Sequence, residues 1–309
     1  MGFTLGVDTS NYTTSAALVN LETKEYFNSR KLLPVSDGCI GLRQSDALFL
    51  HTKALPEIVE NAICGREVSA VGVSDRPRPF ADSYMPCFLA GVSVASAMAS
   101  VLGCRLYKFS HQAGHIAAAL FSADKLDLIG KPFISFHISG GTTEAVLTEY
   151  DKDCFFKCNI VAQSLDLKMG QAVDRIGNML GLQFPAGKEL DKLSQSGEYS
   201  AKIKPSMKGA NCSISGLPNK AEQLLKNGAS KEDIAFFTVK YLAETVDVMT
   251  IELKKQYGSV PLVFAGGVMS NSYIRKYITE KYGAFFASPE LSSDNAVGIA
   301  VMTAILENS

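Results

Sequence analysis

The sequence predicts a duplicated α/β fold. Two segments, at residues 5–19 and 133–147, share one layout: an apolar strand, a polar turn and a second apolar strand. Helical patterns lie between and after the two copies, an alternation typical of α/β proteins. With 309 residues, of which 47% are hydrophobic and 20% charged, the chain is long enough for two medium domains. We therefore expect two domains built on the same plan.

Further elements follow from periodicity and from turn residues. In the first half, helical patterns at 45–64 and 86–102 flank a short strand at 70–74. In the second half we expect a helix at 167–180, which a Gly/Pro bend at 181–187 ends, and then a polar loop at 202–208. A helical stretch at 230–257 and a strand at 261–265 follow. A glycine turn at 266–271 leads into a helix from about 272, and an apolar C-terminal helix at 296–306 ends the predicted elements.

Composition excludes several classes of protein. The formal net charge of -1 offers no general attraction for nucleic acid, so any RNA contact must come from a local basic surface. The candidates for it are Lys202, Lys204, Lys208 and the two loop arginines, Arg76 and Arg78. The N-terminus lacks the pattern of a signal peptide, and the apolar stretch 87–103 is short and interrupted for a membrane span. Seven scattered cysteines indicate reduced thiols. We expect a cytoplasmic protein without membrane contact.

A pair of histidines suggests a metal site. The chain has four histidines, and His111 and His115 are spaced so that a helix would place both imidazoles on one face. A third, His137, directly precedes Ile138 and the Ser139-Gly140-Gly141 turn. The alternative is a chance pair on a solvated helix face. Two ligands are too few for a metal, so the hypothesis needs further donors.

Three turns rich in glycine or hydroxyl groups follow apolar strands, at 8–15, 139–143 and 266–271. Such turns can present backbone N–H groups to phosphate. Each one alone is more often plain loop geometry, because glycine tolerates positive φ. Neither the P-loop pattern nor a dinucleotide fingerprint occurs, so a standard version of either site is excluded.

Taken together, the motifs resemble the TsaD/Gcp family. These are tRNA adenosine threonylcarbamoyltransferases, formerly described as O-sialoglycoprotein endopeptidases, of the actin-like, sugar-kinase and Hsp70 ATPase superfamily. The motifs that carry the resemblance, in chain order, are Asp8-Thr-Ser10, His111-x-x-x-His115, Ser139-Gly-Gly-Thr142, Asp174 with Pro185-x-Gly187, Ser213-x-Ser-Gly216, Ala265-Gly-Gly-Val-x-x-Asn271 and Asp294-Asn295. They span nearly the whole chain.

The resemblance implies two actin-like domains with a ligand cleft between them, residues 1–107 plus 294–309 and residues 108–293. It also implies one divalent metal, iron or zinc, held by His111, His115 and Asp294, with His137 as a further candidate ligand. The alternative for His137 is packing at a strand end. The ligand would be an adenylate (threonylcarbamoyl-AMP, ATP or AMP), held by Ser139, Gly140, Gly141, Thr142, Asp174, Gly187, Gly266 and Asn271.

The implied reaction is transfer of the threonylcarbamoyl group to the exocyclic amine of adenosine in tRNA, with AMP leaving. The metal would polarise the carbamoyl carbonyl, and no protein nucleophile is required. Asp8 and Ser10 would orient phosphate, metal or water; a structural turn role is the alternative for Asp8. By resemblance the partners are tRNA, a homologous subunit like TsaB and a small ATPase, and homodimerisation is also possible.

Two segments depart from the family pattern and leave the acceptor open. The loop at 74–87 is rebuilt around two arginines, and the segment 164–171 replaces the usual acidic one. A divergent paralogue that transfers a carbamoyl-type group to another acceptor is therefore one alternative, and a non-catalytic nucleotide-binding scaffold is another. The histidine pair counts against the scaffold. A zinc-protease function is disfavoured because no glutamate follows His111.

Overall fold

The computed structural model describes residues 2–10, 12–34, 42–80 and 82–309. Its contacts divide the chain into two compact units. The first comprises residues 1–127, 150–157 and 293–309, and the second comprises 128–149 and 158–292. The expected domain boundary at 107/108 differs from this division: the helix that carries the histidine pair lies in the first unit, because it packs against the C-terminal helix.

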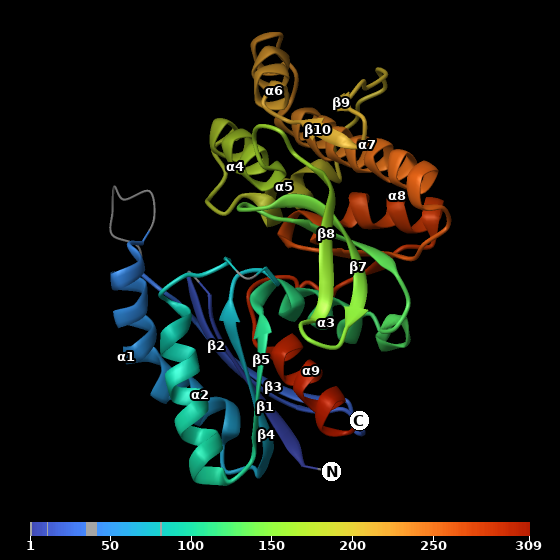
Figure 1. Ribbon diagram of the computed structural model, residues 1–309. Coiled ribbons are helices and arrows are strands. Elements are labelled where there is room, and N and C mark those ends of the chain that lie inside the picture. Colours follow the sequence, from blue (N-terminus) through green and yellow to red (C-terminus); the bar gives the residue numbers. More distant parts are fainter. Residues whose placement is uncertain (1, 11, 35–41, 81) are drawn as a thin grey trace. The chain divides into compact units, whose positions relative to one another are not determined.

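The first unit is a five-stranded sheet covered by helices (Figure 1). The strands are β1 (Phe3–Ser10), β2 (Thr13–Asn20), β3 (Glu25–Leu32), β4 (Val68–Arg76) and β5 (Arg105–Ser110), in the order β3-β2-β1-β4-β5. The first three form an antiparallel meander, and β4 and β5 continue the sheet in parallel with β1. The helices are α1 (Gln44–Ile63), α2 (Phe88–Leu102), α3 (His111–Ser122) and α9 (Val297–Glu307).

Small residues decide how close helix α9 lies to this sheet and to α3. A Cβ on Gly6 of β1 would lie 2.5 Å from the backbone nitrogen of Ala300 in α9. Likewise, a Cβ on Gly298 of α9 would lie 1.8 Å from the carbonyl oxygen of Gly114 in α3. Only glycine permits such close backbone contact. As a result α3 and the segment that leads into α9 are held against each other.

The second unit repeats this topology. Its main sheet has the order β8-β7-β6-β11-β12, again a three-stranded portion continued by two strands parallel to its first member. The strands are β6 (Phe133–Ile138), β7 (Thr143–Asp151), β8 (Phe155–Gln163), β11 (Leu262–Ala265) and β12 (Phe285–Phe286). Because both sheets follow one connection pattern, the predicted duplicated α/β fold is confirmed.

Besides its sheet, the second unit consists mainly of helices (Figure 1). They are α4 (Met169–Leu180), α5 (Gly187–Ser194), α6 (Gly216–Lys226), α7 (Lys231–Tyr257), α8 (Ser272–Tyr282) and the short 3-10 helices η1 (Leu126–Leu128) and η2 (Gly267–Ser270), of which η1 spans the boundary between the units. The hairpin of β9 (Ser206–Lys208) and β10 (Asn211–Ser213) occupies part of the expected loop 202–208. In the described part of the chain, no helix combines the length and apolar character that a membrane crossing requires.

Candidate functional site

The histidine pair begins a helix. Ser110 ends β5 and caps α3, its hydroxyl oxygen accepting a hydrogen bond from the Ala113 backbone N–H at 3.2 Å. His111 is therefore the first helical residue, and His115 follows one turn later on the same face. Their Nε2 atoms lie 2.9 Å apart. The helical spacing predicted from the sequence is present, and both imidazoles point at one spot.

Asp294 supplies a third donor to this spot. Its Oδ1 atom lies 3.2 Å from Nε2 of His115 and 3.7 Å from Nε2 of His111. Thr13 of β2 also donates a hydrogen bond to Asp294 Oδ2 at 3.3 Å. Asp294 lies in the segment before α9, so the close contact of Gly114 with Gly298 brings it to the histidines. Within the described residues, these three side chains form a group that could hold a metal ion.

The spacing of the three donor atoms fits one metal ion. With metal–ligand bonds of about 2.1 Å, neighbouring ligands lie about 3.0 Å apart in an octahedral site and about 3.4 Å apart in a tetrahedral one. The observed separations of 2.9, 3.2 and 3.7 Å bracket these values. Two imidazoles and one carboxylate are ligands suited to iron or zinc, and three protein ligands leave positions for water or substrate. The donor set therefore passes the geometric test.

Asp8 lies behind the histidine pair and orients His111. The Asp8 side chain is 1% exposed, and its Oδ1 atom lies 3.0 Å from Nδ1 of His111. Such a carboxylate fixes the ring and leaves Nε2 for a metal. Burial would lower the pKa of His111, but the charges of Asp8 and Asp294 and the hydrogen bond to Asp8 raise it to about 9. The site thus favours positive charge, as a proton or as a metal.

Asp8 itself stays ionised. Burial would raise its pKa, but the charge and the hydrogen bond of His111 outweigh burial and hold the pKa below its usual range. Ser10 is also buried; its backbone N–H donates to Asp8 Oδ2 at 3.3 Å. Its hydroxyl has no hydrogen-bond partner among the residues that the structure describes. Asp8 therefore contacts a histidine directly, whereas the Ser10 hydroxyl is left for other contacts.

His137 lies in the second unit and is not a member of the three-residue group. It is in β6, next to Ala265 of β11 and Glu144 of β7 in the sheet register. Its role as a fourth ligand stays a prediction.

A cavity of about 550 Å³ lies within the second unit. Four of the eight predicted adenylate residues line it: Gly140, Asp174, Gly187 and Asn271. Apolar walls come from α4, α5, α7, η2 and α8, and the residues that form them are Val173, Leu190, Val239, Leu242, Val268 and Ile274. A cavity of this size with apolar walls and a few polar groups suits a nucleoside.

The other four predicted residues do not line the cavity, and the sequence could not separate the two sets. Ser139 and Thr142 close their own turn, in which the Ser139 N–H donates to the Thr142 carbonyl at 2.7 Å. Gly266 has φ of +99° and packs on β6, where a Cβ would lie 2.3 Å from the Ile138 carbonyl oxygen. Gly141 has open space around its Cα. These positions shape the turns next to the cavity.

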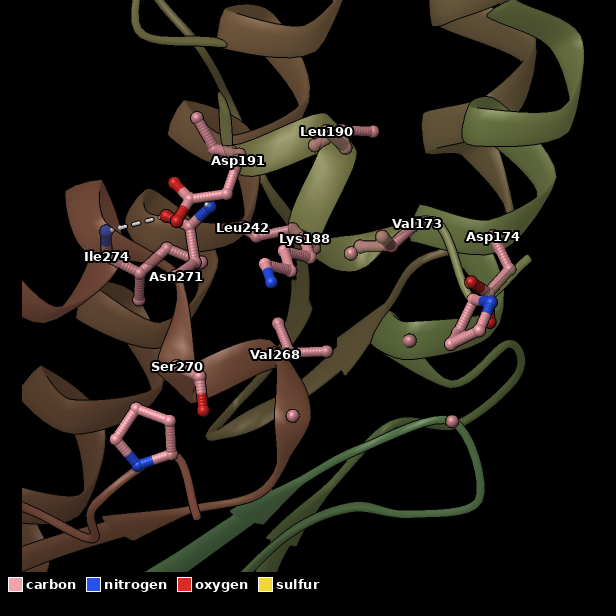
Figure 2. Close-up of a pocket in the computed structure, with 17 residues that line it drawn as sticks. Val173, Asp174, Lys188, Leu190, Asp191, Leu242, Val268, Ser270, Asn271 and Ile274 are labelled. Atoms are coloured by element: carbon pink, nitrogen blue, oxygen red, sulfur yellow. Dashed lines mark hydrogen bonds between the residues drawn. The ribbon is translucent and has the colours of Figure 1, made fainter. Parts of the chain in front are cut away.

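Polar groups stand at two sides of the cavity (Figure 2). On one side Asp174 accepts a hydrogen bond from the Ala186 N–H at 2.9 Å, which fixes the bend before α5. On the other side Asn271 caps α8, accepting from the Ile274 N–H at 3.0 Å and donating to Asp191 at 2.9 Å. Both predicted residues therefore also support the local backbone.

Sequence reasoning missed two charged residues of the cavity. Lys188 is, among the described residues, the one cation that lines it, and Figure 2 shows its side chain between Asp174 and the Asp191–Asn271 pair. Asp191 accepts hydrogen bonds from Asn271 and from the hydroxyl of Ser272. The sequence analysis did not predict helix α5. On a helix that starts at Gly187, the i+4 spacing places Asp191 on the same face as the predicted residue Gly187, and this would have indicated Asp191.

Comparison with known proteins matches the chain to one family. A family model described as TsaD, tRNA N6-adenosine threonylcarbamoyltransferase, matches residues 51–301. A tRNA N6-adenosine threonylcarbamoyltransferase from Thermosipho africanus is 30% identical over 264 residues, which are 81% of this chain and 78% of that protein.

Solved structures share the fold at low sequence identity. Component A of the (R)-2-hydroxyglutaryl-CoA dehydratase of Acidaminococcus fermentans has a TM-score of 0.57 at 17% identity, covering 100% of both chains. A ROK-family glucokinase from Streptomyces griseus, solved with glucose and AMPPNP, has a TM-score of 0.54 at 15% identity, also covering 100% of both chains. These likenesses establish the duplicated actin-like fold and nothing about the ligand.

The matched range contains every residue of the three-donor group and of the cavity. The expected resemblance is thereby confirmed: the chain belongs to the TsaD family, the tRNA N6-adenosine threonylcarbamoyltransferases.

Proposed function

We propose that the protein transfers the threonylcarbamoyl group of threonylcarbamoyl-AMP to the exocyclic amine of adenosine in tRNA. Membership of the family makes the chain a transferase of the acyltransferase type. The observation that carries the specific proposal is that one matched range contains both a fitting three-donor group and a nucleoside-sized cavity. The transfer needs both kinds of group, one to hold the adenylate and one to activate the carbamoyl carbon.

The cavity of the second unit would hold the adenylate. Its apolar walls suit the base, and Asp174 and Asp191 can accept hydrogen bonds from ribose hydroxyls. Lys188 would contact the phosphate as a point charge. The remaining free N–H of the Asn271 amide would be a further donor, since only one of its N–H groups is used by Asp191. Together these groups would fix the leaving AMP in place.

The three-donor group of the first unit would hold one iron or zinc ion through His111, His115 and Asp294. Such an ion supplies Lewis acidity, which withdraws electron density from the carbamoyl carbonyl. Asp8 keeps the proton of His111 on Nδ1, so that Nε2 presents its lone pair. The Ser10 hydroxyl is buried without a hydrogen-bond partner among the described residues, so a bound water molecule would satisfy it. The attacking amine needs no covalent intermediate with the protein.

We further propose that tRNA is the acceptor and that a homologous TsaB-like subunit and a small ATPase assist the reaction. Co-purification of the tagged chain, followed by mass spectrometry of the captured proteins, tests the partner proposal. We expect a protein of related fold and an ATPase in near-stoichiometric amounts. Recovery of the chain alone, or of a homodimer alone, would contradict it.

Nucleoside mass spectrometry tests the reaction. Purified protein is incubated with threonylcarbamoyl-AMP and unmodified tRNA, with and without the proposed partners, and the digested nucleosides are measured. We expect threonylcarbamoyladenosine with the wild type and none with Asp294→Asn. Asp124→Asn is the matched control, because Asp124 is an exposed aspartate that pairs with Lys24 in the same unit.

Metal analysis of the same preparations separates the two parts of the proposal. The wild type and Asp124→Asn should retain iron or zinc, and Asp294→Asn should lose it. The proposed reaction is contradicted if the tRNA stays unmodified although the wild type carries metal, binds nucleotide and is supplied with its proposed partners. Equal metal content in Asp294→Asn would contradict the metal site. Loss of threonylcarbamoyladenosine from the tRNA of a strain lacking this gene would support the function in the cell.

A further inference from the structure

A second cavity lies in the same unit, next to helices α6 and α7. Its volume is about 370 Å³. The segment after α5 forms one wall with Tyr199, Lys202 and Lys204, and α6 contributes Lys220. The other walls come from α7. Neither the family motifs nor the adenylate cavity includes these residues.

The charge of this cavity is one-sided. Three lysines line it, Lys202, Lys204 and Lys220, and no carboxylate is among the lining residues that the structure describes. All three lysines are exposed, and none makes an ion pair within the described residues, whereas Lys226 on the same helix α6 pairs with Glu222 at 2.6 Å. Glu244 of α7 interacts electrostatically with Lys202 but does not line the cavity. The cavity therefore offers three lysines without an ion pair among the described residues, and Glu244 offsets part of the charge of one of them, Lys202.

Aromatic rings form the floor of the cavity. The ring centroids of Tyr199 and Phe237 are 4.8 Å apart, and Lys220 lies over the ring of Tyr241 at 5.1 Å. Lys240 donates a hydrogen bond to the Tyr199 carbonyl at 3.0 Å, so the Tyr199 segment is tied to α7. Because Phe237 and Tyr241 are buried and Tyr199 is only partly exposed, the rings support the lysines, and the lysines are the groups that would contact phosphates of a nucleic acid.

Helix α7 separates the two cavities. Val239 and Leu242 of α7 line the adenylate cavity, whereas Phe237 and Tyr241 line the basic one. At about 100° per residue, the first two point to the side of the helix opposite the second two. One helix diameter, about 10 Å, therefore separates a ligand in one cavity from a ligand in the other. A group bound in the basic cavity is not the adenylate.

We propose that this basic cavity, lined by Lys202, Lys204 and Lys220, binds the phosphate backbone of the RNA substrate at a distance from the reacting nucleoside. The proposal rests on the proposed function, which requires tRNA as acceptor. Exposed lysines are screened by salt and hold a single free phosphate weakly, but they act together on a polyanion by releasing counterions. Because the net charge of the chain is -1, RNA binding needs such a local cluster.

The test is tRNA binding by the full-length protein. Fluorescently labelled unmodified tRNA is titrated with the wild type and with the variant Lys202→Gln/Lys204→Gln/Lys220→Gln at several salt concentrations. The matched control is Lys226→Gln/Lys255→Gln/Lys276→Gln, which removes the same charge from the same unit at lysines that already pair with glutamates. A fluorescent ATP analogue, which probes the other cavity, reports whether each variant is folded.

One phosphate contact contributes a salt slope of about 0.7–0.9. At 0.1 M salt, each lysine is therefore worth about five- to eightfold in affinity. We expect the cavity variant to bind tRNA about a hundredfold more weakly or worse, with a salt slope lower by about 2–3, and to bind the ATP analogue normally. The control should stay within about twofold of the wild type.

The possible failures are distinguishable. If the wild type modifies tRNA and the cavity variant binds tRNA as tightly as the control, the inference is wrong and the proposed function stands. If the cavity variant loses the ATP analogue and keeps tRNA, the lysines support the other cavity and not RNA binding, and the inference is also wrong. If the lysines govern tRNA binding but no transfer occurs, the proposed reaction fails and the RNA site remains. Single-lysine variants, with five- to eightfold effects expected, replace the triple variant if it does not fold.

Discussion

Replacing Asp8 by asparagine tests the coupling between the buried carboxylate and the candidate metal site. The amide keeps the size of the side chain and can still accept a hydrogen bond from His111 Nδ1, which lies 3.0 Å from Asp8 in the wild type. The substitution therefore removes one negative charge and preserves the ring orientation. The amide NH2 group then replaces the Oδ2 atom that accepts the Ser10 N–H at 3.3 Å, so a loss of metal affinity is assigned to the charge when the variant keeps the stability of the wild type in a denaturant titration.

The size of the effect follows from the geometry. An ion bound to His111 Nε2 would lie about 6–7 Å from the Asp8 carboxylate, since the ring and the metal bond each add about 2 Å. Charges of -1 and +2 at that distance, with an effective dielectric constant of 20, interact by about 5 kcal/mol, which is an upper bound. Outer-shell carboxylates are worth about 10- to 100-fold in metal affinity, or about 1.4–3 kcal/mol. We expect Asp8→Asn to fall within that range.

The assay is competition between the protein and a chelator of known affinity, with Zn²⁺ or, anaerobically, Fe²⁺. The exposed carboxylate variant Asp124→Asn serves as the control and should match the wild type, because Asp124 pairs with Lys24 away from the three donors. A dissociation constant for Asp8→Asn within twofold of the wild type would refute the reasoning. It would mean that Asp8 serves only the folded backbone.

Two further predictions concern stability. His51 is fully buried, and burial lowers its pKa to about 4, although the charge of Asp8 opposes this. Because the folded protein holds His51 neutral, the unfolded chain binds a proton first as the pH falls below about 6.5, the pKa of an unperturbed histidine. The free energy of unfolding therefore decreases between about pH 6.5 and pH 4, by about 3 kcal/mol in total. Denaturant titrations of His51→Leu should therefore show a flatter pH profile than the wild type over that window; parallel profiles would contradict the prediction. In α4, Gly170→Ala would place a Cβ 2.5 Å from the backbone nitrogen of Gly140, which lines the cavity of the second unit. We expect a loss of about 1–3 kcal/mol and weaker nucleotide binding, whereas Gly216→Ala, with open space around it, should cost almost nothing; equal stabilities would contradict the clash.

Several fold elements could be predicted because their signals are local. The strand–turn–strand repeats, helix α4 with its glycine end and the long helix α7 follow from the periodicity of neighbouring residues. Several other elements escaped prediction, among them β5, β8, α6, strand β3 and helix α5. β3 is polar and only partly buried, so it lacks the alternation of a half-buried strand. α5 spans only eight residues and follows a proline and a glycine, which signal a loop in a sequence.

The same contrast holds for the candidate sites. By itself the sequence established the spacing of His111 and His115, since that spacing depends only on one turn of helix. Family motifs then nominated Asp294 and eight adenylate residues. They could not tell which four of the eight face the cavity, nor that Lys188 and Asp191 join them. Those distinctions depend on which side of a turn or helix faces inward, and packing decides that.

Tertiary structure alone assembled the groups from distant parts of the chain. Asp294 reaches the histidines because α9 packs on α3 through two glycines. Lys220 joins Lys202 and Lys204 because α6 and the segment after α5 both pack on α7. A local pattern records how neighbours along the chain are spaced. The distances between donors or charges far apart in sequence are determined by long-range packing, which no local pattern contains.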